Sequence, residues 1–246
     1  HLAIWDDHDY GPNNSNASFA LKDETLRLFQ RYWPNPGFGL PGTPGTFGVA
    51  RYGDLTFFLL DDRYYRSPNG MPDGPARTMF GRRQIEWLKQ ALAAAPRDGI
   101  KIVAGGSQFW KRAGRYEGWH RFATERRAFA DWLIAQKIEG VVFLSGDRHF
   151  GELLKVHRPD AYPLHEFTSS PLTSRPPARL DKEDRENPDV VPGTQVGKRQ
   201  FGLIRVTGPG DARRLSLESY DGAGALLWRH EVRAIDLRFP APGPRP

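Results

Sequence analysis

The sequence predicts an α/β fold that becomes α+β in its last third, with layered β-sheets and flanking helices. Three observations predict it: short apolar runs end abruptly in polar clusters, segments of helical periodicity lie between these runs, and short strand-like runs without helices follow after about residue 160. Continuous apolar runs are typical of buried parallel strands, whereas hairpin-linked runs are typical of antiparallel strands.

Four apolar runs have the length and composition of strands. They cover residues 2–5, 55–60, 100–106 and 141–146. The polar clusters that follow them are Asp6-Asp7-His8-Asp9, Asp61-Asp62-Arg63, Ser107-Gln108 and Asp147-Arg148-His149. Because functional residues of α/β sheets gather beyond the carboxyl ends of the strands, we expect these clusters to lie near one another.

Three segments between the runs have helical spacing of apolar residues, at 19–33, 82–95 and 122–137. Later strands are expected at 165–170, 201–207, 213–221 and 226–235, joined in part by the turn sequences GPGD and DGAG. Two Gly- and Pro-rich stretches, 34–48 and 175–197, are expected to be surface loops that border a site. We interpret residues 1–238 as one domain and 239–246 as a disordered tail.

Composition excludes several classes of protein. The chain has no cysteine, so a metal ion would be held by oxygen and imidazole ligands. Its 246 residues include no apolar stretch of the roughly 20 residues that span a bilayer, so no transmembrane segment is expected. The net charge of +6 comes from scattered Lys and Arg residues without a basic stripe, and we expect no specific nucleic-acid partner.

The densest polar cluster is Asp6-Asp7-His8-Asp9. Three carboxylates and an imidazole within four residues repel one another unless a cation lies among them, and hard oxygen donors with imidazole suit Mg, Ca, Mn, Fe or Zn. Taken alone, the cluster is equally consistent with an exposed acidic turn that caps the following helix.

A second cluster ends the run at 141–146, where Asp147 and His149 are separated by one residue. This spacing projects both side chains in one direction from an extended backbone. An isolated pair of this kind more often belongs to a salt-bridged surface turn, but two clusters that each follow a parallel strand favour a metal centre.

Arg63 and Gln108 are weaker candidates for substrate binding. The Arg63 guanidinium could recognise a bound phosphate in a bidentate manner, although a structural ion pair that anchors the strand end is the better explanation. Gln108 follows the neighbouring run and could contact a substrate.

The motifs together resemble the PhoD-type alkaline phosphatases, within the calcineurin-like metallophosphoesterases. The resemblance rests on WDDHDYG at 5–11, LLDDRYYR at 59–66, GRRQIEWLKQAL at 81–92, GGSQFW at 105–110, LSGDRHFGE at 144–152 and FTSSPLTS at 167–174. It covers residues 1 to about 232, and the combination of WDDHD with SGDRH is specific.

The resemblance implies a metallophosphatase-type β-sandwich whose binuclear metal site hydrolyses phosphate mono- or diesters through a metal-bound hydroxide. Asp7, Asp147 and His149 would be metal ligands, and His8 would protonate the leaving oxygen. The two metal ions would be Fe and Ca as in the family, with Zn, Mn or Mg as alternatives. Other implied properties are a monomeric protein and, for the parent chain, a periplasmic or extracellular location.

One departure from the family pattern concerns motifs that precede WDDHD. An Asp-containing first-strand motif and a GD-x-x-Y or GD-x-x-D motif supply further ligands in the family, and this sequence contains neither. We therefore expect a C-terminal fragment without the N-terminal strands, inactive by itself and active as part of a longer parent. The alternative is a catalytically inactive binding module of metallophosphatase fold.

Overall fold

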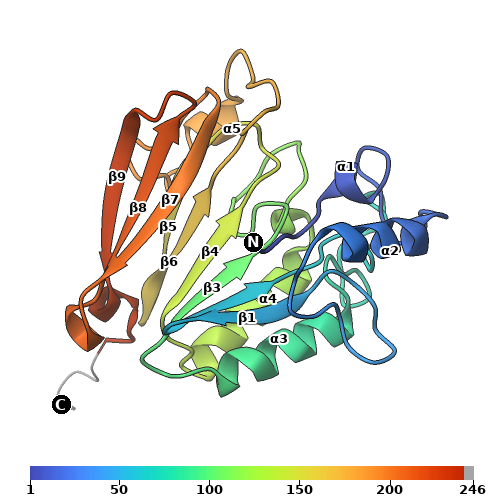
Figure 1. The fold of residues 1–246 in the computed structure, drawn as a ribbon, viewed down its shortest axis with the longest axis horizontal. Coiled ribbons are helices and arrows are strands. Elements are labelled where there is room, and N and C mark those ends of the chain that lie inside the picture. The colour runs from blue at the N-terminus through green and yellow to red at the C-terminus, as the bar shows by residue number, and fades with distance from the viewer. Residues whose placement is uncertain (241–246) are drawn as a thin grey trace.

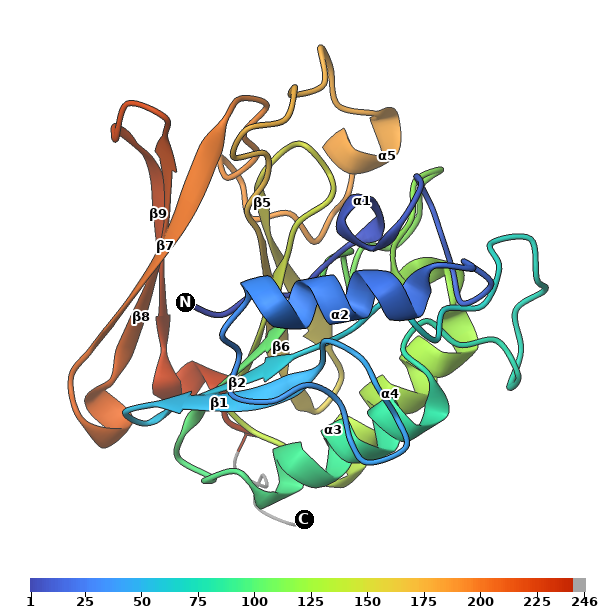
Figure 2. The same ribbon diagram turned by 45° about the vertical axis from the view of Figure 1, so that its right-hand side comes forward.

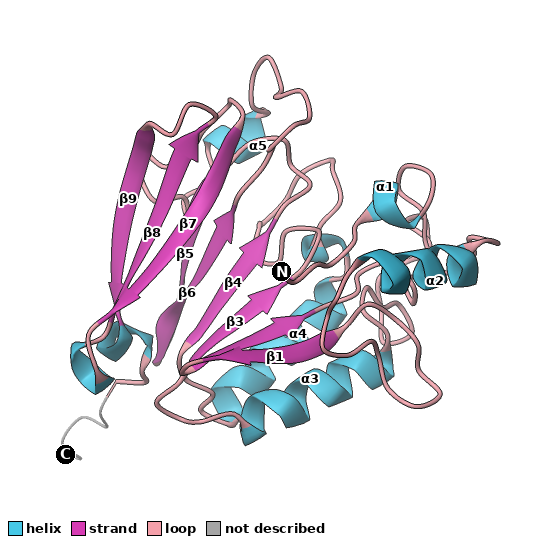
Figure 3. Cartoon of the chain, in the orientation of Figure 1, coloured by secondary structure: helices cyan, strands magenta, loops and turns pink. Residues whose placement is uncertain are grey.

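The computed structural model describes residues 1–240, which form two β-sheets with flanking helices (Figures 1 and 3). The helices are α1 (Asp7–Tyr10), α2 (Lys22–Tyr32), α3 (Arg82–Ala94), α4 (Ala123–Ala135) and α5 (Lys182–Arg185), with short 3₁₀ turns at Trp119–Arg121, Gly210–Ala212 and Ala234–Leu237. The strands are β1 (Gly48–Tyr52), β2 (Leu55–Leu59), β3 (Ile100–Ala104), β4 (Val141–Ser145), β5 (Glu152–Arg158), β6 (Ala161–Thr168), β7 (Gln200–Thr207), β8 (Arg214–Asp221) and β9 (Leu226–Arg233).

The larger sheet has six strands in the order β1-β2-β3-β4-β6-β5. Its four central strands are parallel, and β1 and β5 pair antiparallel at the two edges. Central strands such as Ile100–Ala104 are almost continuously apolar because α3 and α4 cover one face and the smaller sheet lies against the other (Figure 2).

The smaller sheet consists of β7, β8 and β9 in antiparallel order. Leu215 and Leu217 of β8 are fully buried, as expected for alternating residues on the inner face of a sandwich. Contact between the sheets includes the rings of Phe167 and Trp228, whose centroids are 5.0 Å apart. The predicted layered fold with antiparallel strands at its C-terminal end is therefore confirmed.

A second apolar cluster holds the N-terminal segment. It contains Trp5, Tyr10, Leu26, Phe29 and Tyr64, all buried. The cluster packs α2 against α1 and against the chain that follows β2, so the acidic turn has a rigid base.

The prediction of a strand at residues 2–5 is wrong. This segment has no strand partner within the described residues; instead the amide side chain of Asn35 accepts from the Ala3 N–H at 2.9 Å and donates to the Ala3 carbonyl at 2.7 Å. The apolar side chains of Ala3 and Trp5 pack in the second apolar cluster rather than in a sheet. Strands β1 and β5 were not predicted, because their mixed composition at the edges of the sheet carries no clear alternation.

Phe239 begins the segment predicted as a disordered tail. Its N–H donates to the Glu139 carboxylate at 2.9 Å, and its ring lies 5.4 Å from that of Tyr162. Residues 241–246 of the predicted tail lie outside the described residues. None of the helices in residues 1–240 has the length and hydropathy needed to cross a membrane.

Candidate metal centre

The acidic turn is a single helical turn, α1, that follows Trp5. The Asp9 carboxylate accepts from the Asp6 N–H at 3.3 Å and closes a capping box at the start of the turn. The Asp7 carboxylate accepts from the His8 N–H at 2.8 Å and from the Asn14 N–H at 2.9 Å. The first of these bonds fixes the backbone of Asp6, and the other two orient the Asp7 carboxylate.

Asp147 lies in the loop that follows β4. It has a φ of 62°, in the left-handed region that non-glycine residues rarely adopt. The loop is held tightly, since the Gly146 N–H donates to the Gly106 carbonyl at 2.9 Å and the Arg148 N–H donates to the Gly146 carbonyl at 2.7 Å. The backbone therefore fixes Asp147 in a conformation that costs energy, as is common at functional sites.

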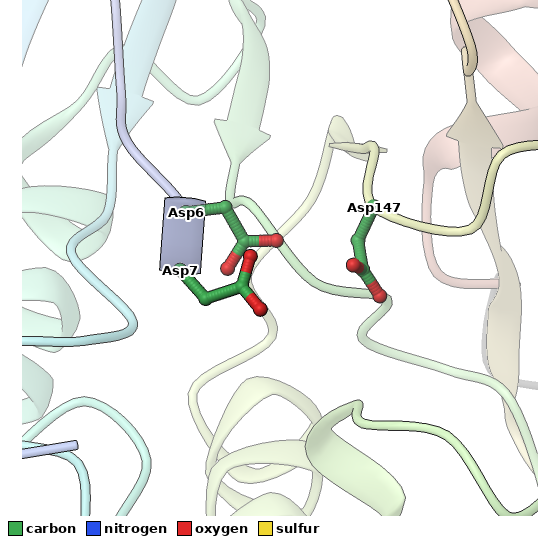
Figure 4. A group of neighbouring side chains, drawn as sticks. All are labelled: Asp6, Asp7 and Asp147. Carbon is green, nitrogen blue, oxygen red and sulfur yellow. The ribbon is translucent and has the colours of Figure 1, made fainter. Parts of the chain in front are cut away.

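These two segments bring three carboxylates together (Figure 4). Asp6, Asp7 and Asp147 each offer an oxygen atom, and these oxygens lie within 4.8 Å of one another. Asp6 and Asp147, but not Asp7, line a hollow of about 290 Å³, together with the chain after β3 at Gly105 and Gly106. The carboxyl ends of β3 and β4 thus meet α1 at one site, as the pattern of polar clusters predicted.

The electrostatics of the cluster favour a cation. Burial raises the pKa of Asp6 well above its ordinary value, with Asp62, Asp147 and Asp7 adding to the increase and Arg63 opposing it. Burial likewise raises the pKa of Asp147, and the Asp7 charge adds to it. A divalent ion among these oxygens would remove the repulsion.

The residues present also fit a metal ion in their donor chemistry. The Asp6 Oδ2 atom is buried and has no hydrogen-bond partner among residues 1–240. A buried acceptor of this kind costs free energy unless something binds it. Three carboxylates form a hard oxygen set that suits Ca, Mg, Mn or Fe.

Arg63 lies beside the cluster as a counter-ion. Its side chain is fully buried, its Nε donates to Asp6 Oδ1 at 2.6 Å, and its Nη1 lies 2.7 Å from Glu117 Oε2. Burial lowers its pKa, but the charges of Asp6, Asp62 and Glu117 outweigh that effect and raise it. Its guanidinium is thus engaged by protein carboxylates, and a contact with substrate phosphate stays a prediction.

Gln108 is buried within a polar network and does not line the hollow. Its Nε2 donates to Glu152 Oε1 at 2.8 Å and to Thr168 Oγ1 at 3.0 Å. A role in substrate binding stays a prediction for this residue.

The two candidate histidines are both exposed. His8 lies on α1 between Asp7 and Asp9 and is not part of the three-carboxylate group. His149 Nδ1 lies 3.0 Å from the Arg175 carbonyl, which can only accept, so Nδ1 is the donor of this bond and Nε2 takes no part in it. That arrangement is common among metal-ligating histidines, although His149 is not part of the three-carboxylate group.

Sequence reasoning missed two residues of the site. Asp6 was noted within the acidic cluster but received no role, although two adjacent aspartates in one turn were a signal for it. Glu117, which pairs with Arg63 and with Arg66 at 2.9 Å, lies in an irregular loop with no motif around it. No signal in the sequence could have found Glu117.

Comparison with known proteins identifies the family. The profile of the PhoD-like phosphatase family matches residues 1–212. The chain belongs to this family. This PhoD-like chain is similar to a solved structure of PhoD, with a TM-score of 0.68 and 20% sequence identity. The match covers 94% of the present chain and 54% of the PhoD chain. At this identity the match shows the fold, and the chain spans about half the length of the PhoD structure. No curated protein sequence matches the chain.

Proposed function

We propose that this PhoD-like chain belongs to a metal-dependent phosphoric ester hydrolase that cleaves phosphate mono- or diesters with water. The observation that carries the proposal is the convergence of Asp6, Asp7 and Asp147 from two separate segments beside one hollow. Membership of the PhoD-like phosphatase family supports a phosphate ester as the substrate.

Cations at this site would be held by the three carboxylates. The resemblance predicts two of them, with Fe and Ca as the first expectation and Zn, Mn or Mg as alternatives. When bound, such ions neutralise charge on a phosphoryl group and lower the pKa of a coordinated water. Nε2 of His149 is a further candidate ligand, because the bond from its Nδ1 to the Arg175 carbonyl leaves Nε2 free.

The chain's other residues would orient this site. Arg63 would favour the ionised form of Asp6 and hold its carboxylate in place through the Nε and Nη2 atoms. His8 would protonate the leaving oxygen, and its exposed position on α1, next to Asp7, supports that role. A monomeric state and an export destination stay predictions.

The test combines cation binding with hydrolysis. Residues 1–246 and the longest natural chain that contains them would be titrated with Mn²⁺ and Ca²⁺ and assayed on bis(p-nitrophenyl) phosphate and p-nitrophenyl phosphate. Asp7→Asn and Asp147→Asn should each weaken cation affinity by more than about tenfold, because affinity depends on the number of charged ligands. Asp131→Asn, on the exposed side of α4, is the matched control and should bind as the unmodified protein does.

The outcomes separate two functions. Hydrolysis that requires the cation and is lost with Asp147→Asn supports the hydrolase. If cations bind and neither chain hydrolyses either ester, a catalytically inactive binding module becomes the better account. Cation affinity that is unchanged in both aspartate variants would contradict the site itself.

A further inference from the structure

A short loop separates the two acidic segments of the hollow. Gly106 follows β3, and a methyl group at its Cβ position would lie 2.7 Å from Asp6 Cγ and 2.8 Å from Asp6 Cβ. On its other side, the Gly106 carbonyl accepts from the Gly146 N–H at 2.9 Å, next to Asp147. The backbone at Gly106 thus acts as a spacer between the Asp6 carboxylate and the segment that carries Asp147.

The same loop is anchored farther along by Glu166 of β6. Its Oε1 accepts from the Phe109 N–H at 2.8 Å, and its Oε2 accepts from the Trp110 N–H at 2.7 Å. Asp62 gives a second anchor, accepting from the Ser107 N–H at 2.9 Å. The loop is therefore held at both ends by buried carboxylates.

Glu166 also reaches the segment that carries Asp147. The hydroxyl of Ser145, two residues before Asp147, donates to Glu166 Oε1 at 2.7 Å. Glu166 is fully buried, and within residues 1–240 it has no ion-pair partner at salt-bridge distance. A buried carboxyl group is costly unless it is hydrogen-bonded, and every hydrogen bond that Glu166 accepts comes from the chain after β3 or from the end of β4.

We propose that Glu166 is a positioning residue for the cation site: it locks the Gly105–Trp110 loop and the end of β4 to each other, and through Gly106 it sets the separation of Asp6 from Asp147. This inference rests on the proposed function, because it takes the separation of Asp6 from Asp147 to be the one that a bound cation requires. The ligands would be Asp6, Asp7 and Asp147, and neither Glu166 nor Gly106 would be one of them.

The expected effect follows from the hydrogen-bond inventory. In Glu166→Gln one oxygen becomes an NH₂ donor, which faces an N–H and cannot accept from it. Gly106→Ala introduces a methyl group that forces Asp6 to move, and Gly106 has no left-handed φ that would add backbone strain. Both variants should change the spacing of the carboxylates while the two sheets remain folded.

The experiment measures Mn²⁺ affinity and the electron paramagnetic resonance spectrum of bound Mn²⁺. Glu166→Gln and Gly106→Ala should each weaken Mn²⁺ affinity by about tenfold or more, which is the loss expected when a group that orients metal ligands is removed. Both variants should also change the spectrum of bound Mn²⁺. Leu217→Ala, in the core beneath the smaller sheet, controls for stability and should bind Mn²⁺ as the unmodified chain does. Gly197→Ala, where an added methyl meets nothing, controls for the glycine change.

Two further measurements test the contact of Gly106 with Asp6 and the hydrogen bonds of Glu166 separately. In an Asp6→Gly background, Gly106→Ala should cause no additional loss of affinity, because the atoms it displaces are gone. Without any metal, Glu166→Gln should accelerate hydrogen exchange at the amides of Phe109, Trp110 and Gly146, and leave β8 protected.

The outcomes distinguish this inference from the proposed function. An unmodified protein that binds no Mn²⁺ overturns the proposed function and, with it, the positioning of a cation. Normal Mn²⁺ binding by Glu166→Gln, or unchanged exchange at Gly146, overturns the inference and leaves the proposed function standing.

Discussion

The indole Nε1 of Trp5 donates a 2.8 Å hydrogen bond to the buried carboxylate of Asp61. The same carboxylate accepts from the backbone N–H groups of Thr46 at 2.9 Å, Arg63 at 3.0 Å and Tyr64 at 2.9 Å. One side chain after β2 therefore fixes the residue that precedes the acidic turn, the end of the loop before β1, and the backbone of Arg63. The position of α1 relative to the sheet depends on this carboxylate.

Replacing Trp5 by Phe should test this dependence. The variant keeps a ring in the second apolar cluster but leaves one acceptor position of a fully buried carboxylate without its donor. We expect a loss of about 1–3 kcal/mol in the free energy of unfolding, measured by urea denaturation. Trp33→Phe, at an indole that is 43% exposed, should cost less than about 0.5 kcal/mol. Equal losses in the two variants would contradict a special role for the Trp5–Asp61 bond.

A second prediction concerns Glu152 and pH. Burial raises the pKa of Glu152 to about 7, with Asp184 and Glu166 adding to the increase, while hydrogen bonds from Gln195 and Gln108 oppose it. Because the folded pKa exceeds the unfolded one, the folded state binds more protons between roughly pH 4.5 and 7. The contribution of Glu152 to stability is therefore fully present below that range and is lost as the pH rises through it.

Glu152→Gln removes this titration. We expect the unmodified protein to lose stability relative to the variant as the pH rises from about 5 to about 8, by up to roughly 3 kcal/mol. The measurement is the free energy of unfolding at a series of pH values, with the exposed Glu86→Gln as a control that should follow the unmodified protein. Parallel curves for the unmodified protein and Glu152→Gln would show that Glu152 is ionised in the folded state throughout.

Particular residues show what the sequence could predict. The runs that became β2, β3 and β4 are almost continuously apolar because both faces of the sheet are covered, and that signal is local. Asp7 and Asp147 are predicted metal ligands because each lies in a polar cluster that follows an apolar run. The structure places both in the three-carboxylate group, as expected for clusters at one edge of a sheet.

The remainder depends on contacts between distant segments. Residues 2–5 have strand composition, yet their burial comes from α2 and the chain after β2, which no local pattern reveals. Arg63 carries the same sequence signal whether it faces a phosphate or pairs with Asp6 and Glu117. Likewise, Gln108 follows a strand like a site residue but turns into the network of Glu152 and Thr168, because those buried groups need its donor.

The last prediction concerns residues 175–197. Asp184 of α5, within this segment, pairs with Arg148, which follows Asp147 of the site. Asp184 of α5 is buried and lies 2.5 Å from Lys111 Nζ and 2.7 Å from Arg148 Nη2, and both cationic side chains are 3% exposed. Breaking a buried pair is costly because the partner charges remain without compensation. Asp184→Asn should therefore lower the free energy of unfolding by about 3–5 kcal/mol, and hydrogen exchange should accelerate across 175–197 before it does in the sheets.

Asp181→Asn is the matched control for this prediction, since it lies three residues away in the same segment. Asp181 pairs at 3.3 Å with Arg115, whose side chain is 70% exposed. An exposed pair of this kind contributes at most about 1 kcal/mol because solvent screens it. If the two variants lose similar stability, or if exchange within 175–197 is unchanged in Asp184→Asn, then the buried ion pairs of Arg148 and Lys111 do not hold this segment against the rest of the fold.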